Sequence, residues 1–367
     1  MSKLTLNTTP VDARPAPKRS IGAIAWLRAN LFQGPINSVL SLLAIWALIA
    51  GLTPLIQWAI IDADWIGTSR EACSSGGACW VFISARFEQF IYGFYPSELR
   101  WRVNLTFVLF AVMIAWLALP RLPAKKLAAV LTLVIFPIVA FYLLHGGSFG
   151  MPAVPTHRWG GLMLTLVLAV VGIVAALPIG VVLALGRQSK MPIVKSISVV
   201  FIEFWRGVPL ITVLFMASVM LPLFVPTEVD MDKLVRALIG ITLFQSAYMA
   251  EVVRGGLQAI PKGQEEAAAA LGMGYWKRMG LIVLPQALKM MIPGIVNTFI
   301  ALFKDTSLVL IIGLFDLLAI VQAALADADW LGYSIEGYVF VAFVFWIFCF
   351  GMSRYSQYLE RKLHTGH

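Results

Sequence analysis

Charged and hydroxyl side chains interrupt two otherwise apolar stretches of this sequence. They are Glu203 and Arg206 in the first stretch, and Lys304, Asp305, Thr306 and Ser307 in the second. A charged side chain at the centre of a bilayer costs at least about 2.5–3.5 kcal/mol, so we expect these groups to pair, or to face water or a ligand. A planar guanidinium binds both oxygens of a carboxylate. Two simpler interpretations stay open: a structural pair between Glu203 and Arg206, and an interfacial helix end at 304–305.

The composition indicates an all-α integral membrane protein. Of 367 residues, 60% are hydrophobic and only 13% are charged, whereas soluble domains average about 25% charged residues. The net charge of +9 does not predict a nucleic-acid partner, because the basic residues lie between apolar stretches instead of forming one basic face. Membrane lipid is the expected surrounding. We expect no cleavable signal peptide, because the first twenty residues are polar.

The apolar stretches predict about eight transmembrane helices, since a bilayer core about 30 Å thick needs about twenty residues. Gly207 and Pro209 are expected to break the fifth helix and to free backbone carbonyls beside a cavity. Residues 62–102 are expected to form a polar, aromatic loop, and 314–336 an amphipathic segment. The expected spans are 38–61, 103–119, 127–144, 161–186, 196–224, 236–255, 285–312 and 338–353.

The distribution of lysine and arginine predicts the orientation. Nineteen of them lie in or beside the segments on the side of both termini, and seven lie on the opposite side. The positive-inside rule then places both termini in the cytoplasm. The expected divisions are a cytoplasmic tail (1–30), a three-helix extension with a cysteine-containing outer loop (31–158), a transmembrane core (159–360) and a cytoplasmic C-terminal tail (361–367).

The segment 261–285, PKGQEEAAAALGMGYWKRMGLIVLP, is the long polar-to-mixed piece between two apolar spans. Its alanines favour a helix, and Glu265 and Glu266 suit the first turn. Gly272 and Gly274 are expected to end that helix before a second, amphipathic piece. The sequence therefore predicts a bent, two-piece helix that fits a cleft on another protein, although an alanine-rich helix ending in glycine also arises by chance.

This segment resembles the coupling loop of importer-type ATP-binding-cassette (ABC) permeases. The matching positions are Glu266, Ala267, Ala268 and Gly272, followed by Ile282, Leu284 and Pro285. Three further runs resemble the polar-amino-acid branch of that family, and the region before 159 resembles the extended N-terminal part of general L-amino-acid permeases. The three runs are EFWRGVPL at 203–210, AYMAE with RGG at 247–256, and PQA with KDTSL at 285–308.

The resemblance implies a five-helix permease core and an ATP-driven uptake system for polar L-amino acids in a bacterial inner membrane. It implies docking of Glu266, Ala267, Ala268 and Gly272 on a cytoplasmic ATPase dimer that binds ATP and Mg²⁺, so no cofactor is expected in this chain. A second, related permease and a periplasmic amino-acid-binding protein are the other implied partners. The sequence has no GxxxxGK[ST] phosphate loop, and we expect no catalytic residues and no enzyme activity.

A transported amino acid presents a carboxylate and an ammonium group. We expect Arg206 to bind the carboxylate, with Lys304 as the alternative, and Glu203 or Asp305 with the hydroxyls of Thr306 and Ser307 to bind the ammonium. An ion-gradient-driven transporter or channel is the alternative function, and a membrane-embedded assembly protein would leave these charges unexplained.

The cysteines and histidines complete the candidate residues. Cys73 and Cys79 lie in an outer loop, in the oxidising periplasm, where a disulfide and a pair of free thiols are both open. Cys349 is expected to be a small buried residue. The four histidines show no metal-ligand spacing, so no metal site is expected.

Overall fold

The structure is a computed structural model, and it describes residues 22–363 except 120, 149, 225 and 227–230. Lys3, Arg14, Lys18 and Arg19, which belong to the predicted cytoplasmic tail, lie outside the described residues. The chain divides into two compact units, one of Met1–Trp65 with Cys73–Cys79 and the other of Ile66–Ala72 with Trp80–His367. The division predicted at 30, 158 and 360 stays a prediction.

The first unit contains α1 (Ala23–Asn30) and α2 (Pro35–Ile56), and α2 continues as a π-helical turn at Gln57–Ile61. Proline at the start of α2 is suited to the first helical turn, where its missing N–H is harmless. No residue of α2 is buried. A helix that is apolar on all sides is expected to lie in lipid, as predicted for the span 38–61.

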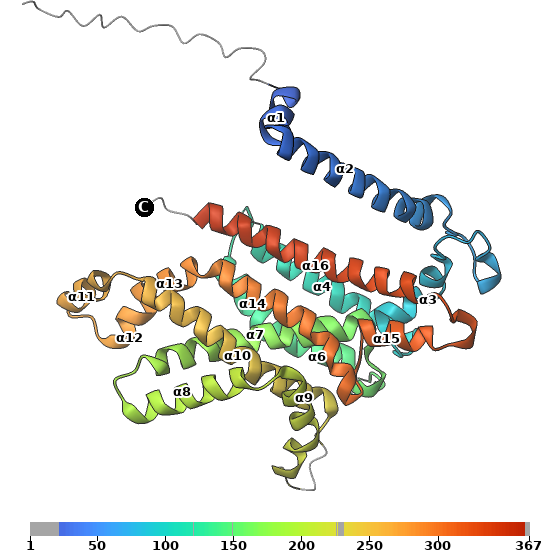
Figure 1. The fold of residues 1–367 in the computed structure, drawn as a ribbon. Coiled ribbons are helices and arrows are strands. Elements are labelled where there is room, and N and C mark those ends of the chain that lie inside the picture. Colours follow the sequence, from blue (N-terminus) through green and yellow to red (C-terminus); the bar gives the residue numbers. More distant parts are fainter. Residues whose placement is uncertain (1–21, 120, 149, 225, 227–230, 364–367) are drawn as a thin grey trace, which may run out of the picture. The chain divides into compact units, whose positions relative to one another are not determined.

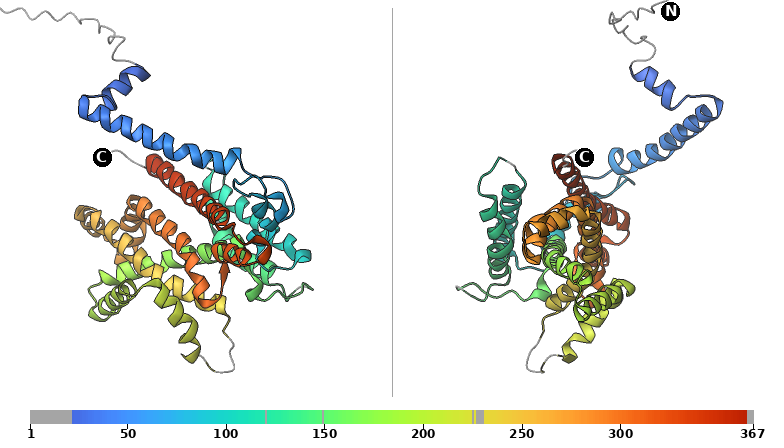
Figure 2. Two further views of the ribbon diagram at one scale, coloured as in Figure 1. Left: turned by 45° about the vertical axis from the view of Figure 1, so that its right-hand side comes forward. Right: turned by 90° about the vertical axis from the view of Figure 1, so that its left-hand side faces the viewer.

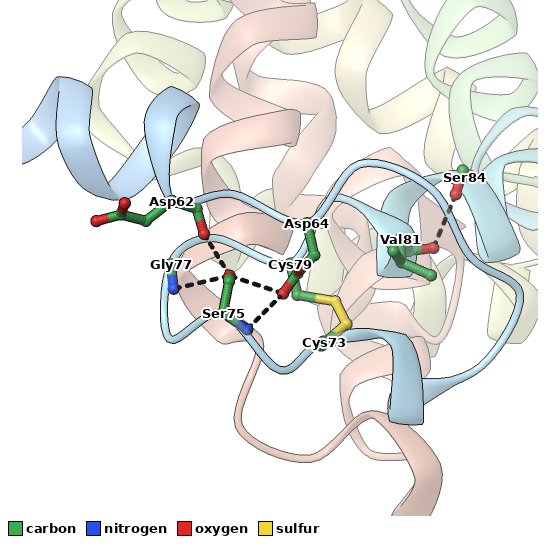
Figure 3. The surroundings of a disulfide bond; sticks show 8 residues. All are labelled: Asp62, Asp64, Cys73, Ser75, Gly77, Cys79, Val81 and Ser84. Carbon is green, nitrogen blue, oxygen red and sulfur yellow. Dashed lines mark hydrogen bonds between the residues drawn. A yellow bond between two sulfur atoms is a disulfide. The ribbon is translucent and has the colours of Figure 1, made fainter.

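The loop after α2 is held by a disulfide and a serine (Figure 3). Cys73 and Cys79 are joined by the disulfide, with their Cα atoms 5.5 Å apart. Ser75 donates its backbone N–H and its hydroxyl to the Asp64 carboxylate at 3.1 and 2.8 Å. These hydrogen bonds lower the pKa of the Asp64 carboxyl. The loop is therefore a closed, internally bonded hairpin.

In the part of the second unit that the structure describes, the named elements are helices and one two-residue strand, β1 (Phe315–Asp316). One correction concerns 62–102, predicted as a loop, because the helix α3 lies within it. The helices of this unit are α3 (Val81–Tyr92), α4 (Arg100–Ala118), α5 (Lys125–Val130), α6 (Phe136–His145), α7 (Gly161–Arg187), α8 (Pro192–Gly207), α9 (Leu210–Val219), α10 (Lys233–Ala259), α11 (Lys262–Ala270), α12 (Tyr275–Arg278), α13 (Leu284–Met290), α14 (Ile292–Asp305), α15 (Leu317–Leu325) and α16 (Ser334–Leu363). Shorter 3₁₀ turns lie at Arg70–Ala72, Ser97–Leu99, Thr156–Arg158, Leu221–Phe224, Thr306–Ile312 and Ala328–Trp330, and π-helical turns at Leu131–Ile135 and Met279–Val283.

The fold class is confirmed: within the described residues, six helices are long and apolar enough to cross a membrane, or seven if the bent pair α8 and α9 is counted as one span. The axes of α8 and α9 differ by 105° at a short break. The predicted break at Gly207 and Pro209 in the span 196–224 is thus confirmed. The predicted span 236–255 is part of the 27-residue helix α10. It is less apolar than the other spans because it carries charges such as Arg236 and Glu251.

Helix α7 is central to the second unit and contacts α3, α8, α10, α14 and α15 (Figure 1). Small residues allow two of these close contacts. A Cβ atom at Gly180 would lie 2.7 Å from the Met249 side chain of α10, and one at Gly186 would meet the Ser198 hydroxyl of α8. The sequence of α7 therefore fixes which helices pack against its second half.

The first end of α7 is joined by a backbone bridge to Asp316, the residue that caps α15. Gly161 pairs with Asp316 across an isolated β-bridge, and its φ of +62° is accessible to glycine at little cost. Asp316 is completely buried and caps α15 by accepting hydrogen bonds from the Leu318 and Ala319 N–H groups at 3.3 and 3.0 Å. Burial raises the pKa of the Asp316 carboxyl to about 6.

Candidate functional site

The segment 261–285 has the predicted bent, two-piece form. Helix α11 ends in a turn in which Gly272 has a φ of +74°. There the Met273 N–H donates to the Ala268 carbonyl at 3.2 Å. Helix α12 begins after Gly274, and the chain returns through a π-helical turn into α13, which has Pro285 in its first turn. The two pieces stand at one end of the unit, where α10 ends and α13 begins (Figures 1 and 2).

The surface of this segment is available to a partner. Of the four predicted docking residues, Glu266, Ala267 and Gly272 are exposed, and Ala268 is buried against the chain. Large apolar side chains beside them are also exposed, including Leu271 at 81% and Trp276 at 75%. The surface thus combines an anionic group, a small-residue face and apolar side chains.

An ion pair connects the two pieces of the segment. Arg278, at the end of α12, lies 3.7 Å from the Glu265 carboxylate of α11. Burial and the neighbouring Glu265 carboxylate raise the pKa of the Tyr275 phenol. Glu265 therefore has an internal partner within the described residues, whereas no ion pair is found for Glu266 there.

Glu203 and Arg206 do not form the ion pair that a single helical turn allows. Glu203 accepts a hydrogen bond from Arg187, the last residue of α7, at 2.8 Å. Arg206 lies 3.6 Å from the Glu251 carboxylate of α10 and over the Tyr248 ring at 5.8 Å. Both residues are thus part of a larger cluster, because α7 and α10 pack beside α8.

Glu251 is the centre of this cluster. Its carboxylate accepts from Arg254 at 2.8 Å and lies 3.0 Å from Arg187. Its side chain is 16% exposed, against 24–35% for the three arginines around it. Three guanidinium groups and the two carboxylates Glu203 and Glu251 leave one positive charge in excess. We name these five residues, Arg187, Glu203, Arg206, Glu251 and Arg254, the arginine–glutamate cluster.

Sequence analysis missed three members of this cluster as site residues. Glu251 and Arg254 stand within the run at 247–256 that was noted for its resemblance. Their spacing of three residues on one helix is a usable signal for an ion pair. Arg187 carries no comparable local signal, because its partners lie 16 and 64 residues away.

The second predicted group, 304–307, is not brought to the arginine–glutamate cluster by any hydrogen bond or ion pair of the described residues. Lys304 is exposed and Asp305 is half-buried, and neither takes part in an ion pair within the described part of the chain. The hydroxyls of Thr306 and Ser307 donate to the Phe303 and Lys304 carbonyls at 2.8 Å. These hydroxyls thus cap the end of α14.

A shallow hollow on α10 offers little to a charged ligand. Thr242 provides its hydroxyl, and the other lining side chains are apolar. The lining residues are Val235, Leu238, Ile239, Thr242 and Leu243.

Comparison with known proteins gives consistent matches over this region and over the whole chain. Residues 176–365 match the family described as "Binding-protein-dependent transport system inner membrane component". The chain is 57% identical over 366 residues to the "Inner membrane amino-acid ABC transporter permease protein YhdY" of Escherichia coli K12, covering 100% of this chain and 99% of that protein.

Two further relatives differ in how much of the chain they match. The "Glutamate/glutamine/aspartate/asparagine transport system permease protein BztC" of Rhodobacter capsulatus is 40% identical over 99% of this chain and 98% of its own length. The "Glutamate/aspartate import permease protein GltK" of Escherichia coli O6:H1 is 32% identical over 58% of this chain and 95% of its own length.

Proposed function

We propose that this chain, which belongs to the binding-protein-dependent transport system inner membrane components and is a permease subunit of an amino-acid ABC importer, carries polar L-amino acids from the periplasm to the cytoplasm. One observation carries the choice of polar substrates. The relative that is 40% identical over 99% of this chain is named for glutamate, glutamine, aspartate and asparagine. The family consists of transport permeases and not of enzymes, and its membership decides against the ion-gradient alternative.

ABC transporter permeases work with ATPase and binding-protein partners. For this chain we propose an ATPase dimer in the cytoplasm, a periplasmic amino-acid-binding protein and a second, related permease. The chain is multi-pass in the inner membrane, with α2, α4, α7, α14 and α16 among its candidate spans. We place both termini and the segment 261–285 in the cytoplasm, because the positively charged residues are concentrated on that side.

The proposed docking surface on the ATPase is α11 with the turn after it. Glu266 is exposed and offers a carboxylate to a basic or hydrogen-bonding group of the partner. A Cβ atom at Gly272 would meet nothing within 4 Å in this chain, so its absence leaves room for the partner. When the ATPase subunits close, the docked segment moves and carries α10 and α13 with it, because it is continuous with both helices.

Substrate recognition is proposed at Arg206. Its guanidinium is the member of the cluster with the longest contact to Glu251, and its side chain is 35% exposed. Glu203, with a side chain 54% exposed, is the nearest candidate for the ammonium group. Asp305, Thr306, Ser307 and Lys304 stay candidates only for a conformation that brings α14 closer.

Co-purification from native membranes tests this assignment. We expect an ATPase and a second, related permease to remain attached to the chain, as identified by mass spectrometry. The purified complex in proteoliposomes is expected to accumulate glutamate and glutamine in the presence of ATP and the binding protein. A chain that purifies without an ATPase, or a complex that transports only apolar amino acids, contradicts the proposal.

A further inference from the structure

The arginine–glutamate cluster connects three separate helices, α7, α8 and α10. Arg187 ends α7, Glu203 and Arg206 lie in the second half of α8, and Glu251 lies on α10. Arg187 lies within 3.0 Å of both carboxylates. Two of the three arginines around Glu251 therefore come from other helices, and Arg254 comes from the same helix, three residues later.

The same three helices share an apolar core with the coupling segment. That core contains Ala184 of α7, Ile202 of α8 and Val253 of α10, together with Met279 and Val283 of the π-helical turn after α12. Helix α10 also continues unbroken from Glu251 to Ala259, which is about 12 Å at 1.5 Å per residue. A displacement of the segment thus reaches the level of the cluster through packed, regular structure.

Helix α8 is the least enclosed of the three helices. Its buried residues are Ser198 and Ile202, whereas Ile193, Ile197 and Val200 are 63–73% exposed. It ends at the break before α9. Within the described residues, the ion pairs that join α8 to α7 and α10 are those of the cluster. Without them, apolar contact on one face alone would hold α8, which carries Arg206.

We infer that Arg187 and Glu251 are positioning residues that fasten α8 to α7 and α10, so that movement of the coupling segment reaches Arg206. This inference rests on the proposed function. The competing explanation is that the ion pairs only stabilise the local fold. Arg254 separates the two explanations, because its pair with Glu251 has the better geometry but lies within one helix, so it makes no link between helices.

The test uses the whole complex in proteoliposomes and measures amino acid transported per ATP hydrolysed. Arg187→Gln removes the link between helices. We expect an assembled complex that still hydrolyses ATP, with transport per ATP lower by about tenfold, inside the range usual for coupling between sites. Arg254→Gln is the matched control. It is expected to keep this ratio within about twofold of the parent, because partly exposed pairs within one helix contribute little.

Two results overturn the inference: an unchanged ratio in Arg187→Gln, or equal losses in Arg187→Gln and Arg254→Gln. If Arg187→Gln does not assemble, Arg187→Lys decides. A lysine keeps the charge but lacks the planar fork that reaches two carboxylates, so a lowered ratio in the assembled complex supports the inference, and an unchanged ratio overturns it. If the parent complex shows no ATP-driven uptake, the result contradicts the proposed function itself.

Discussion

The charged groups beside the two ends of α7 are held in different ways. At the Gly161 end, one carboxylate, Asp316, is completely buried and accepts hydrogen bonds from backbone N–H groups. At the Arg187 end, about 40 Å away along a helix of 27 residues, five charged side chains from three helices share partly exposed ion pairs. Moving Asp316 requires breaking a helix cap and uncovering a buried charge, whereas the side chains of the cluster exchange partners by changing rotamers.

This contrast indicates which end is built to move. A buried, capped carboxylate has one favourable arrangement, so it fixes the start of α15, to which the Gly161 end of α7 is joined by the backbone bridge. The ion pairs of the cluster are partly exposed and individually weak, and the cluster lies at the end where α10 leads to the coupling segment. Under the proposed function, the Gly161 end is the fixed support, and the Arg187 end transmits the motion.

Glu266→Lys should have the largest effect, because it acts on the moving end alone. The substitution reverses a charge at the proposed ATPase interface, where like charges cost several kcal/mol. We expect transport to be lost and the ATPase to dissociate more easily, with the permease still inserted. Labelled amino-acid uptake and co-purification measure the two effects. Glu360→Lys, the same reversal at an exposed position of α16, is the control, and normal uptake by Glu266→Lys would rule out the docking role.

Arg206→Lys should have the next largest effect, confined to recognition. Lysine keeps the charge and loses the fork that binds two carboxylate oxygens. We expect substrate-stimulated transport to be abolished, while the complex assembles and its basal ATP hydrolysis persists. A variant that does not assemble would make Arg206 a structural partner of Glu251. Unchanged uptake of several amino acids would exclude both roles and place the substrate site on the other permease.

Local features of this molecule were predictable from the sequence, and partners distant in the chain were not. Gly207 with Pro209, and Gly272 with Gly274, ended helices where expected, because proline and glycine act on their own backbone. The pairing of Arg206 was different. A neighbour one turn away, Glu203, was available, but the packing of α7 and α10 against α8 pairs Glu203 with Arg187 and Arg206 with Glu251. That outcome depends on which helices pack together, and single-sequence spacing does not contain it.

Asp316→Asn tests the fixed end and should have a smaller effect. The folded pKa of about 6 for the Asp316 carboxyl lies above its ordinary value of 3.8, so the folded protein binds the proton more tightly. Its free energy of unfolding therefore falls as pH rises from about 4 to 6. Two pKa units correspond to about 3 kcal/mol. Asparagine keeps a capping oxygen without the charge, so we expect this loss of stability to disappear from thermal unfolding curves recorded between pH 4.5 and 7. An equal pH dependence in parent and variant would contradict a carboxylate held in a fixed, buried cap.

Reduction of the disulfide in the cysteine loop should have the smallest effect on transport. This loop belongs to neither end of α7, so it is a reference for the effects at the two ends. A disulfide that closes a loop this short stabilises by about 2 kcal/mol in the chain-entropy account, and the Ser75–Asp64 hydrogen bonds remain when it is reduced. In a Cys349→Ser background, we expect Cys73 and Cys79 to react with a membrane-impermeant thiol reagent only after reduction, and only from the periplasmic side. Uptake should stay within about twofold of the oxidised protein, because the loop holds its shape by other bonds.

Labelling before reduction would show that the bridge is absent in the cell, and labelling from the cytoplasmic side would reverse the proposed orientation. A large loss of uptake on reduction would mean that the loop takes part in transport, so that motion is not confined to the Arg187 end.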